Sequence, residues 1–287
     1  MATNPAEENS YVLDAESGAE MARLIDQDIM ITQAMGGLFP RDFDLSTIHR
    51  VLDVACGPGG WALSVAFAYP QMQVTGIDIS RTVIQYAQAQ AQVRELKNVT
   101  FRVMDATKPL DFADGSFDMV NARALIGFMP NTGWSAFIQE ALRILRPGGT
   151  LRLTESDDLG FTNSAAQETL TRLGVLALER AGKTFAPPGG RNAGLTPMLG
   201  RFLRRAGFVN IQRAAYAIDY SAGEPAHDDV CHDLLAIHTL SLPLFTKTKV
   251  ATEEEIQALS QQAAADMLSD DFCGLLYLLS VWGTKPA

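Results

Sequence analysis

The hydrophobic pattern points first to a strand, a glycine turn and a helix in the first quarter of the chain. Residues 51–55 form a short apolar run, which is typical of a strand buried on both faces. The run breaks at the glycine-rich residues 57–60 and restarts as the apolar segment 61–67, which predicts a helix that ends before Pro70. Glycine lets a ligand lie against the main chain, and the free N–H groups of a helix start favour a negative group. The turn is therefore a candidate binding site.

Apolar runs and amphipathic stretches continue to alternate after this turn. Strands that alternate with helices predict an α/β fold with a largely parallel sheet. The predicted strands lie at 51–54, 74–77, 99–104, 117–122, 150–154, 208–220 and 272–282, and helices are predicted at 81–96 and 134–146.

Carboxylates occupy three successive predicted strands. Asp53 lies within the first strand, Asp78 ends the second and Asp105 ends the third. The ends of parallel strands meet in one crevice, and Asp78 follows the glycine turn at the distance of a ribose-binding acid. Residues 57–62 also satisfy G-x-G-x-x-A, a pattern that is weak in isolation. Several acids would repel a diphosphate but suit a ribose, an ammonium and a sulfonium, which indicates S-adenosylmethionine (SAM).

Four segments of the chain resemble one enzyme family. They are DVACGPGG at 53–60, GIDIS at 76–80, MDATKPLDFADGSFDMV at 104–120 and LRPGGTLRL at 145–153. Over about a hundred residues they resemble the class I SAM-dependent methyltransferases, and they are similar to the small-molecule branch with the ubiquinone- and menaquinone-type methyltransferases. The resemblance implies a Rossmann-like α/β fold, in which a mostly parallel seven-stranded sheet has an antiparallel last strand and helical cap insertions.

The resemblance also implies which residues hold SAM. Asp78 would accept hydrogen bonds from both ribose hydroxyls, because an ionised carboxylate presents two acceptor oxygens. Ile79 would lie against the adenine, Asp105 and Ala106 would read its amino group, and the backbone near Asn121 would hold the methionine ammonium. The predicted cofactor-binding residues are Tyr11, Asp53, Gly57, Gly59, Asp78, Ile79, Asp105, Ala106 and Asn121.

Acidic residues follow the fifth predicted strand, where an acceptor would enter. Glu155 and Asp157 are the candidate catalytic residues, because a carboxylate there could orient or deprotonate the acceptor. The alternative, that both are solvated loop acids, stays open at this point.

A second polar group lies between residues 227 and 238. It contains potential metal ligands, yet no zinc spacing such as H-E-x-x-H or a paired C-x-x-C is present, so we predict a polar helix face and no metal. One of the histidines could instead act as general base for a hydroxyl acceptor, because the pKa of histidine lies near neutrality. The group consists of His227, Asp228, Asp229, Cys231, His232, Asp233 and His238.

We expect a single methyltransferase domain over residues 1–287. A capping-box pattern at Ser17 and Glu20 precedes an N-terminal helical run, and two later stretches exceed a minimal core. These later stretches are rich in aliphatic residues and phenylalanine, which favours an apolar or aromatic small-molecule acceptor. The predicted parts are a helical lid at 1–44, a SAM-binding half at 45–160, and cap elements over the acceptor site at 161–195 and 221–270.

Composition and charge narrow the function classes. The chain has 287 residues and a formal net charge of −10, which argues against a nucleic-acid or anionic-membrane partner. The longest apolar run, 273–283, is too short to span a bilayer. The polar N-terminus, which we expect to be frayed over residues 1–10, is neither a signal nor a transit peptide. The 3 scattered cysteines indicate a reducing cytosol, so we predict a cytoplasmic protein.

The sequence therefore predicts an enzyme that moves the SAM methyl group to an apolar or aromatic small molecule by in-line displacement, leaving S-adenosyl-L-homocysteine. The acceptor atom, whether oxygen, nitrogen or carbon, and the oligomeric state stay open. The alternatives are a nicotinamide-dependent oxidoreductase and a non-catalytic SAM-binding protein. Asp53, and Pro58 inside the turn, speak against the oxidoreductase.

Overall fold

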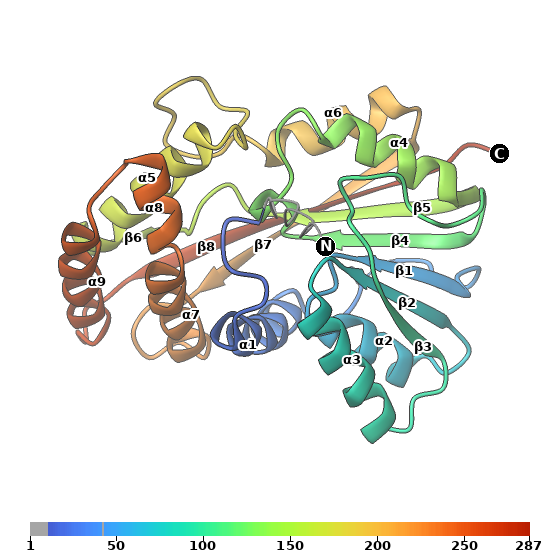
Figure 1. Cartoon of the computed structure of the whole chain (residues 1–287), viewed down its shortest axis with the longest axis horizontal. Coiled ribbons are helices and arrows are strands. Elements are labelled where there is room, and N and C mark those ends of the chain that lie inside the picture. The colour runs from blue at the N-terminus through green and yellow to red at the C-terminus, as the bar shows by residue number, and fades with distance from the viewer. Residues whose placement is uncertain (1–10, 42) are drawn as a thin grey trace, which may run out of the picture.

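The computed structural model describes residues 11–41 and 43–287 and has a mixed sheet with helices on both faces (Figure 1). The predicted fraying of residues 1–10 lies outside the described residues. The strands are β1 (Arg50–Val54), β2 (Gln73–Asp78), β3 (Val99–Val103), β4 (Phe117–Arg123), β5 (Leu145–Glu155), β6 (Phe161–Thr162), β7 (Val209–Asp219) and β8 (Gly274–Thr284). The α-helices are α1 (Gly18–Ala34), α2 (Gly60–Ala68), α3 (Arg81–Val93), α4 (Trp134–Ile144), α5 (Ala165–Arg180), α6 (Thr196–Ala206), α7 (His227–Leu240), α8 (Leu242–Thr248) and α9 (Glu253–Met267), and a 3₁₀ helix, η1, covers Leu125–Gly127.

The sheet begins with five parallel strands in the order β3-β2-β1-β4-β5. The last strand of the chain, β8, is antiparallel to both β5 and β7. The two residues of β6 pair with Leu275 and Gly274, beyond the stretch of β8 that pairs with β5. The parallel order with an antiparallel last strand is thus confirmed, but the described residues form eight strands where seven were expected. Two residues are too few to show the alternation that marks a strand in a sequence.

The parallel strands are covered on both faces. Consecutive side chains of a strand point to opposite faces, so Leu52 and Val54 pack into a core with α4 and α6, whereas Val51 packs into a core with α2 and α3. Figure 1 shows α4 and α6 above the sheet and α2 and α3 below it. These three apolar side chains of β1 are each 0% exposed, as expected of a parallel strand between two helical layers.

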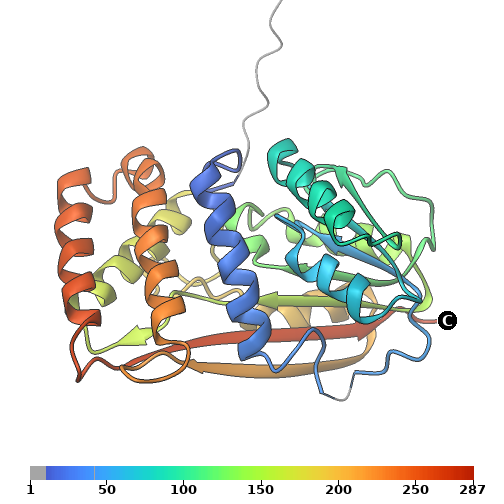
Figure 2. The ribbon, with the colours of Figure 1, turned by 90° about the horizontal axis from the view of Figure 1, so that it is seen from below.

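The remaining helices gather at the other end of the molecule, beside the long strands β7 and β8 (Figure 1). Helices α5, α8 and α9 share a core that includes Leu170, Phe245 and Ile256. Helix α1 lies between α2 and α7 (Figure 2), and its Met30 shares a core with Leu234 of α7. The N-terminal helix is therefore in contact with segments that follow it by about two hundred residues.

Three boundaries differ clearly from the prediction. The helix expected at 81–96 ends at Val93, and the strand expected at 150–154 begins at Leu145. The helix expected at 134–146 ends at Ile144, because Leu145 already pairs with Phe117 and begins β5. An apolar residue at this position fits both the helical stripe and a buried strand, so the pattern does not separate the two. Within the described residues, no helix has both the length and the apolar content that crossing a membrane requires.

Candidate active site

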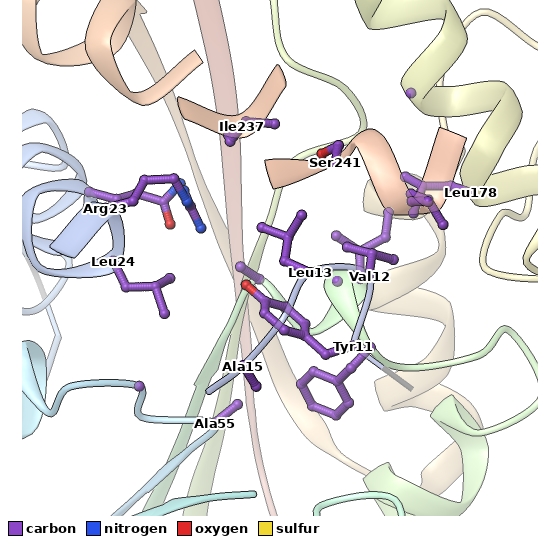
Figure 3. Close-up of a pocket in the computed structure, with 18 of the residues that line it drawn as sticks. Tyr11, Val12, Leu13, Ala15, Arg23, Leu24, Ala55, Leu178, Ile237 and Ser241 are labelled. Carbon is purple, nitrogen blue, oxygen red and sulfur yellow. The ribbon is translucent and has the colours of Figure 1, made fainter. Parts of the chain in front are cut away.

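A cavity lies at the carboxyl ends of the parallel strands, where helices α1, α5, α7 and α8 face the sheet edge (Figure 3). In this view the N-terminal segment with Tyr11 and Leu13 lies between Ala55 on one side and Ile237 and Ser241 on the other. We call the wall formed by Ala55, Gly57, Asp78, Ile79, Ser80, Val83, Met104, Asp105 and Ala106 the sheet end. We call the wall formed by Leu170, Thr171, Gly174, Val175, Leu178, Ile237, His238, Ser241, Leu244 and Phe245 the helical end.

The glycine turn brings the main chain to the cavity wall. Gly57 has a φ of +52° and Gly59 a φ of +83°, in the left-handed region that favours glycine. A Cβ at Gly59 would also lie 2.8 Å from the ring of Phe101. Gly57 lines the cavity and Gly59 does not, so Gly59 shapes the turn that presents Gly57.

Asp78 is held at the end of β2 by two backbone N–H groups. Its Oδ2 accepts from Gly57 at 3.0 Å and its Oδ1 accepts from Ser80 at 3.0 Å. Burial raises the pKa of the Asp78 carboxyl, and these two hydrogen bonds oppose that rise. Each carboxylate oxygen keeps a further lone pair, and Asp78 lines the cavity, so the fixed carboxylate can accept from two ligand hydroxyls.

Three more of the predicted cofactor residues lie on the same wall. Ile79 is 40% exposed, so it offers the cavity an apolar surface suited to a flat ring. The Asp105 Oδ1 accepts from the Thr107 N–H at 2.9 Å and from its hydroxyl at 2.6 Å. Asp105 is thereby held in a local turn beside Ala106. The structure thus brings Ile79, Asp105 and Ala106 together with Asp78.

Asp53 and Asn121 lie deeper, between β1 and β4. They are partners in the sheet register, and the Asn121 Nδ2 donates to the Asp53 Oδ1 at 2.8 Å. They are 3% and 0% exposed, and neither lines the cavity. Burial raises the pKa of Asp53 to about 6. These contacts support the sheet below the cavity, and direct binding of a cofactor by either side chain stays a prediction.

Tyr11 lines the cavity and belongs to a polar network that joins it to α1 and α7. Its hydroxyl donates to Glu20 at 2.6 Å, and Arg23 donates to Glu20 at 2.7 Å and to Asp233 of α7 at 2.7 Å. Burial raises the pKa of the Tyr11 hydroxyl. The capping box at Ser17 is half formed: its Oγ accepts from the Glu20 N–H, while the Glu20 carboxylate serves this network. Sequence reasoning missed Arg23, for which the i,i+3 spacing from Glu20 was the available signal.

Glu155 is fully buried at the end of β5 and does not line the cavity. Its carboxylate accepts from the N–H groups of Leu125 at 2.7 Å and Ile126 at 3.4 Å, at the start of η1. Burial raises its pKa to about 8, and the two hydrogen bonds oppose that rise. Catalysis by Glu155 stays a prediction, which these contacts do not favour.

Asp157 lines the cavity, but its carboxylate is engaged at the start of α6. One oxygen accepts from the N–H groups of Leu195 at 2.6 Å and Thr196 at 2.9 Å, and the other accepts from the Thr196 hydroxyl. Negative charge is favourable at a helix N-terminus. The geometry therefore explains Asp157 as a helix cap, and its predicted catalytic role stays untested.

The histidines of α7 do not form one polar face. His232 is exposed, and the His227 Nδ1 lies 2.9 Å from the carbonyl oxygen of Tyr220. His238 is 1% exposed and lines the cavity, so the predicted polar helix face is wrong for this residue. Across the described part of the chain, no group of three His, Cys, Asp or Glu side chains is placed to hold a metal ion.

Comparison with known proteins adds the family. A family model described as a methyltransferase domain matches residues 51–149. The 27-O-demethylrifamycin SV methyltransferase of Amycolatopsis mediterranei is 36% identical over 135 residues, which cover 47% of this chain and 47% of that enzyme. The demethylmenaquinone methyltransferase of Deinococcus radiodurans is 30% identical over 173 residues, which cover 58% of this chain and 70% of that enzyme. The chain thus matches about half the length of the first relative and over two thirds of the second.

Solved structures share the fold. The YcgJ protein of Bacillus subtilis has a TM-score of 0.54 at 17% identity, over 91% of this chain and 98% of that chain. Phosphoethanolamine N-methyltransferase 2 of Haemonchus contortus, solved with SAM, has a TM-score of 0.54 at 18% identity, over 95% of this chain and 57% of that chain. These likenesses show the fold. The match to the demethylmenaquinone methyltransferase over 70% of its length, with the family model and the glycine turn beside Asp78, shows that the chain belongs to the class I SAM-dependent methyltransferases.

Proposed function

We propose that this protein transfers the methyl group of SAM to an uncharged, apolar small molecule. One observation carries the proposal: the charges on the cavity wall are separated from the apolar surface. Every residue of the helical end is uncharged apart from the titratable His238, and most are aliphatic or aromatic. Burying a charged acceptor against such a wall would cost free energy, because no opposite charge compensates for the lost hydration. The charged lining residues lie elsewhere and are Arg23, Asp78, Asp105, Arg123, Asp157 and Asp158.

The residues at the sheet end fit the cofactor. Asp78 has acceptor capacity for a ribose diol, Ile79 offers an apolar surface to the adenine, and Gly57 brings the main chain to the cavity wall. SAM supplies an activated methyl group, because its sulfonium is a good leaving group. The chain itself has to hold both partners in line and exclude water.

We propose that SAM binds at the sheet end and the acceptor at the helical end, which agrees with the predicted division of the chain into a SAM-binding half and cap elements. The SAM-binding half at 45–160 contains every residue of the sheet end, and the cap elements at 161–195 and 221–270 contain every residue of the helical end. We keep the lid at 1–44 as part of the proposal, since its described portion supplies Tyr11 and Arg23 to the wall. A cytoplasmic location is likewise proposed, supported by three free cysteines in the described residues.

Calorimetry and a transfer assay test the proposal together. We expect saturable binding of SAM and of S-adenosylhomocysteine, and transfer of labelled methyl from SAM to members of a panel of apolar phenols, alcohols and amines, but not to RNA or protein. Saturable binding of NAD without binding of SAM would instead indicate the oxidoreductase. SAM binding without transfer to any panel member would contradict the proposed acceptor class and favour the non-catalytic alternative.

A matched pair of variants tests the cofactor end. In Asp78→Asn the ionised acceptor becomes a neutral amide, so we expect SAM affinity to fall by roughly 1.5–3 kcal/mol, the typical contribution of hydrogen bonds to a charged group. Asp111→Asn is the control, because the Asp111 side chain is 89% exposed and outside the cavity wall. Equal affinities for the two variants would remove Asp78 from the cofactor site.

A further inference from the structure

His238 is a buried imidazole with one unsatisfied nitrogen. It lies near the end of α7, is 1% exposed and lines the helical end of the cavity. Its Nδ1 lies 3.3 Å from the Ser260 Oγ of α9, which fixes the ring. Its Nε2 is buried and has no hydrogen-bond partner among the described residues. Buried polar groups in folded proteins are nearly always paired, so an unpaired nitrogen of a residue that lines a cavity calls for a partner from outside the chain.

The surroundings of His238 restrict what that partner is. Ser241 follows His238 by about one helical turn and lines the same wall (Figure 3), and Thr171 of α5 also lines it. The other seven residues of the helical end carry no polar side-chain atom. The helical end is thus an apolar wall that contains three polar side chains, those of Thr171, His238 and Ser241.

We infer that the helical end binds a hydroxyl group on the acceptor, with the Nε2 of His238 as its hydrogen-bond partner. The inference rests on the proposed function and names the acceptor class more closely, as an apolar alcohol or phenol. The contact with Ser260 can leave the ring proton on Nδ1 or on Nε2. A hydroxyl both donates and accepts, so it can pair with Nε2 in either tautomer. His238 is here a binding and positioning residue that selects the acceptor.

The charge state of the ring agrees with a neutral partner. Burial lowers the pKa of His238 to about 4, so the imidazole is uncharged at neutral pH. An uncharged ring does not compensate a buried carboxylate or phosphate, and no Lys or Arg belongs to the helical end. An anionic acceptor is thereby disfavoured at this wall, whereas a hydroxyl needs only the one hydrogen bond.

Two probes of nearly equal shape test the inference. 2-Naphthol carries a hydroxyl where 2-methylnaphthalene carries a methyl group, and each is titrated into protein already saturated with S-adenosylhomocysteine. We expect the wild-type protein to bind 2-naphthol about tenfold more tightly, the effect of one buried hydrogen bond. His238→Phe keeps a flat ring without nitrogen and should lose the preference, binding 2-naphthol no more tightly than 2-methylnaphthalene, because the hydroxyl then has no partner. His232→Phe, at an exposed position of the same helix, should keep the wild-type preference.

The controls separate this inference from the proposed function. S-adenosylhomocysteine affinity and the melting temperature are measured for each variant, and His238→Leu replaces the phenylalanine variant if that variant unfolds. A partial return of the preference in His238→Gln, whose amide can donate and accept, would support the hydrogen bond. Equal binding of the probes by the wild type, or no binding of either, overturns the inference while the cofactor assignment stands. Loss of S-adenosylhomocysteine binding by the wild type contradicts the proposed function itself.

Discussion

Replacing Glu155 by glutamine separates a structural from a catalytic role for this buried acid. The folded chain holds the Glu155 carboxyl against the N–H groups of Leu125 and Ile126, with no exposed surface. Glutamine has nearly the same shape and keeps one carbonyl oxygen for the shorter of the two hydrogen bonds. It differs by having no charge to bury, so it resembles the protonated acid.

The expected magnitude follows from the raised pKa. Burial moves the pKa of Glu155 from its ordinary 4.5 to about 8 in the folded chain. Between these two values the folded chain binds more protons than the unfolded chain, so the free energy of unfolding falls as the pH rises. With about 1.4 kcal/mol for each pH unit, this one group removes roughly 3 kcal/mol of stability between pH 5 and pH 8. Glu155→Gln abolishes that loss.

Urea unfolding at pH 5 and pH 8 measures the difference. We expect the variant to match the wild type at pH 5, where the acid is protonated, and to be more stable by roughly 2–3 kcal/mol at pH 8. Glu224→Gln, at an exposed carboxylate, serves as the control and should show no such divergence. A variant that gains no stability at pH 8 but loses 10²- to 10⁴-fold in turnover, the typical contribution of a general base, would refute the structural account.

Three other substitutions test packing and buried charge. Gly76→Ala would place a Cβ 2.6 Å from the ring of Phe101, so urea unfolding should show a loss of about 1–3 kcal/mol. Gly174→Ala meets nothing within 4 Å inside α5 and should gain about 0.5–1 kcal/mol in the same assay; a loss there would contradict the open space. Arg23→Met leaves the carboxylate of Asp233 without its buried ion pair and should lower the unfolding free energy by about 3–5 kcal/mol, which calorimetric melting checks. An unchanged melting temperature would show that the pair is hydrated.

The sequence predicted the features that depend on neighbours along the chain. The glycine turn and the acid that ends β2 lie where the strand pattern placed them, because a parallel strand and its turn are local units. The helix predicted to begin at residue 81 does begin there, and Ser80 caps it by accepting from the Val83 N–H at 3.2 Å. Asp78 and Gly57 therefore meet at the cavity wall as predicted.

The features that the sequence did not predict depend on distant partners. Glu155 and Asp157 were placed correctly at the end of β5, but their hydrogen bonds reach η1 and the start of α6, which no local pattern connects to that strand. His238 looked like one polar residue among several on α7. Its burial follows from the packing of α8 and α9 against that helix, and tertiary packing of this kind leaves no signal in helical periodicity.

The sheet end and the helical end of the cavity come from separate stretches of the chain. This separation limits what a sequence comparison over one stretch says about the whole cavity. The sheet end lies within residues 51–149, the stretch that the methyltransferase family model matches, whereas the helical end begins at Leu170. Under the proposed function, substitutions after that point would change which acceptor is bound without altering the wall proposed to hold SAM. A match over residues 51–149 therefore compares the sheet end alone and leaves the helical end out of the comparison.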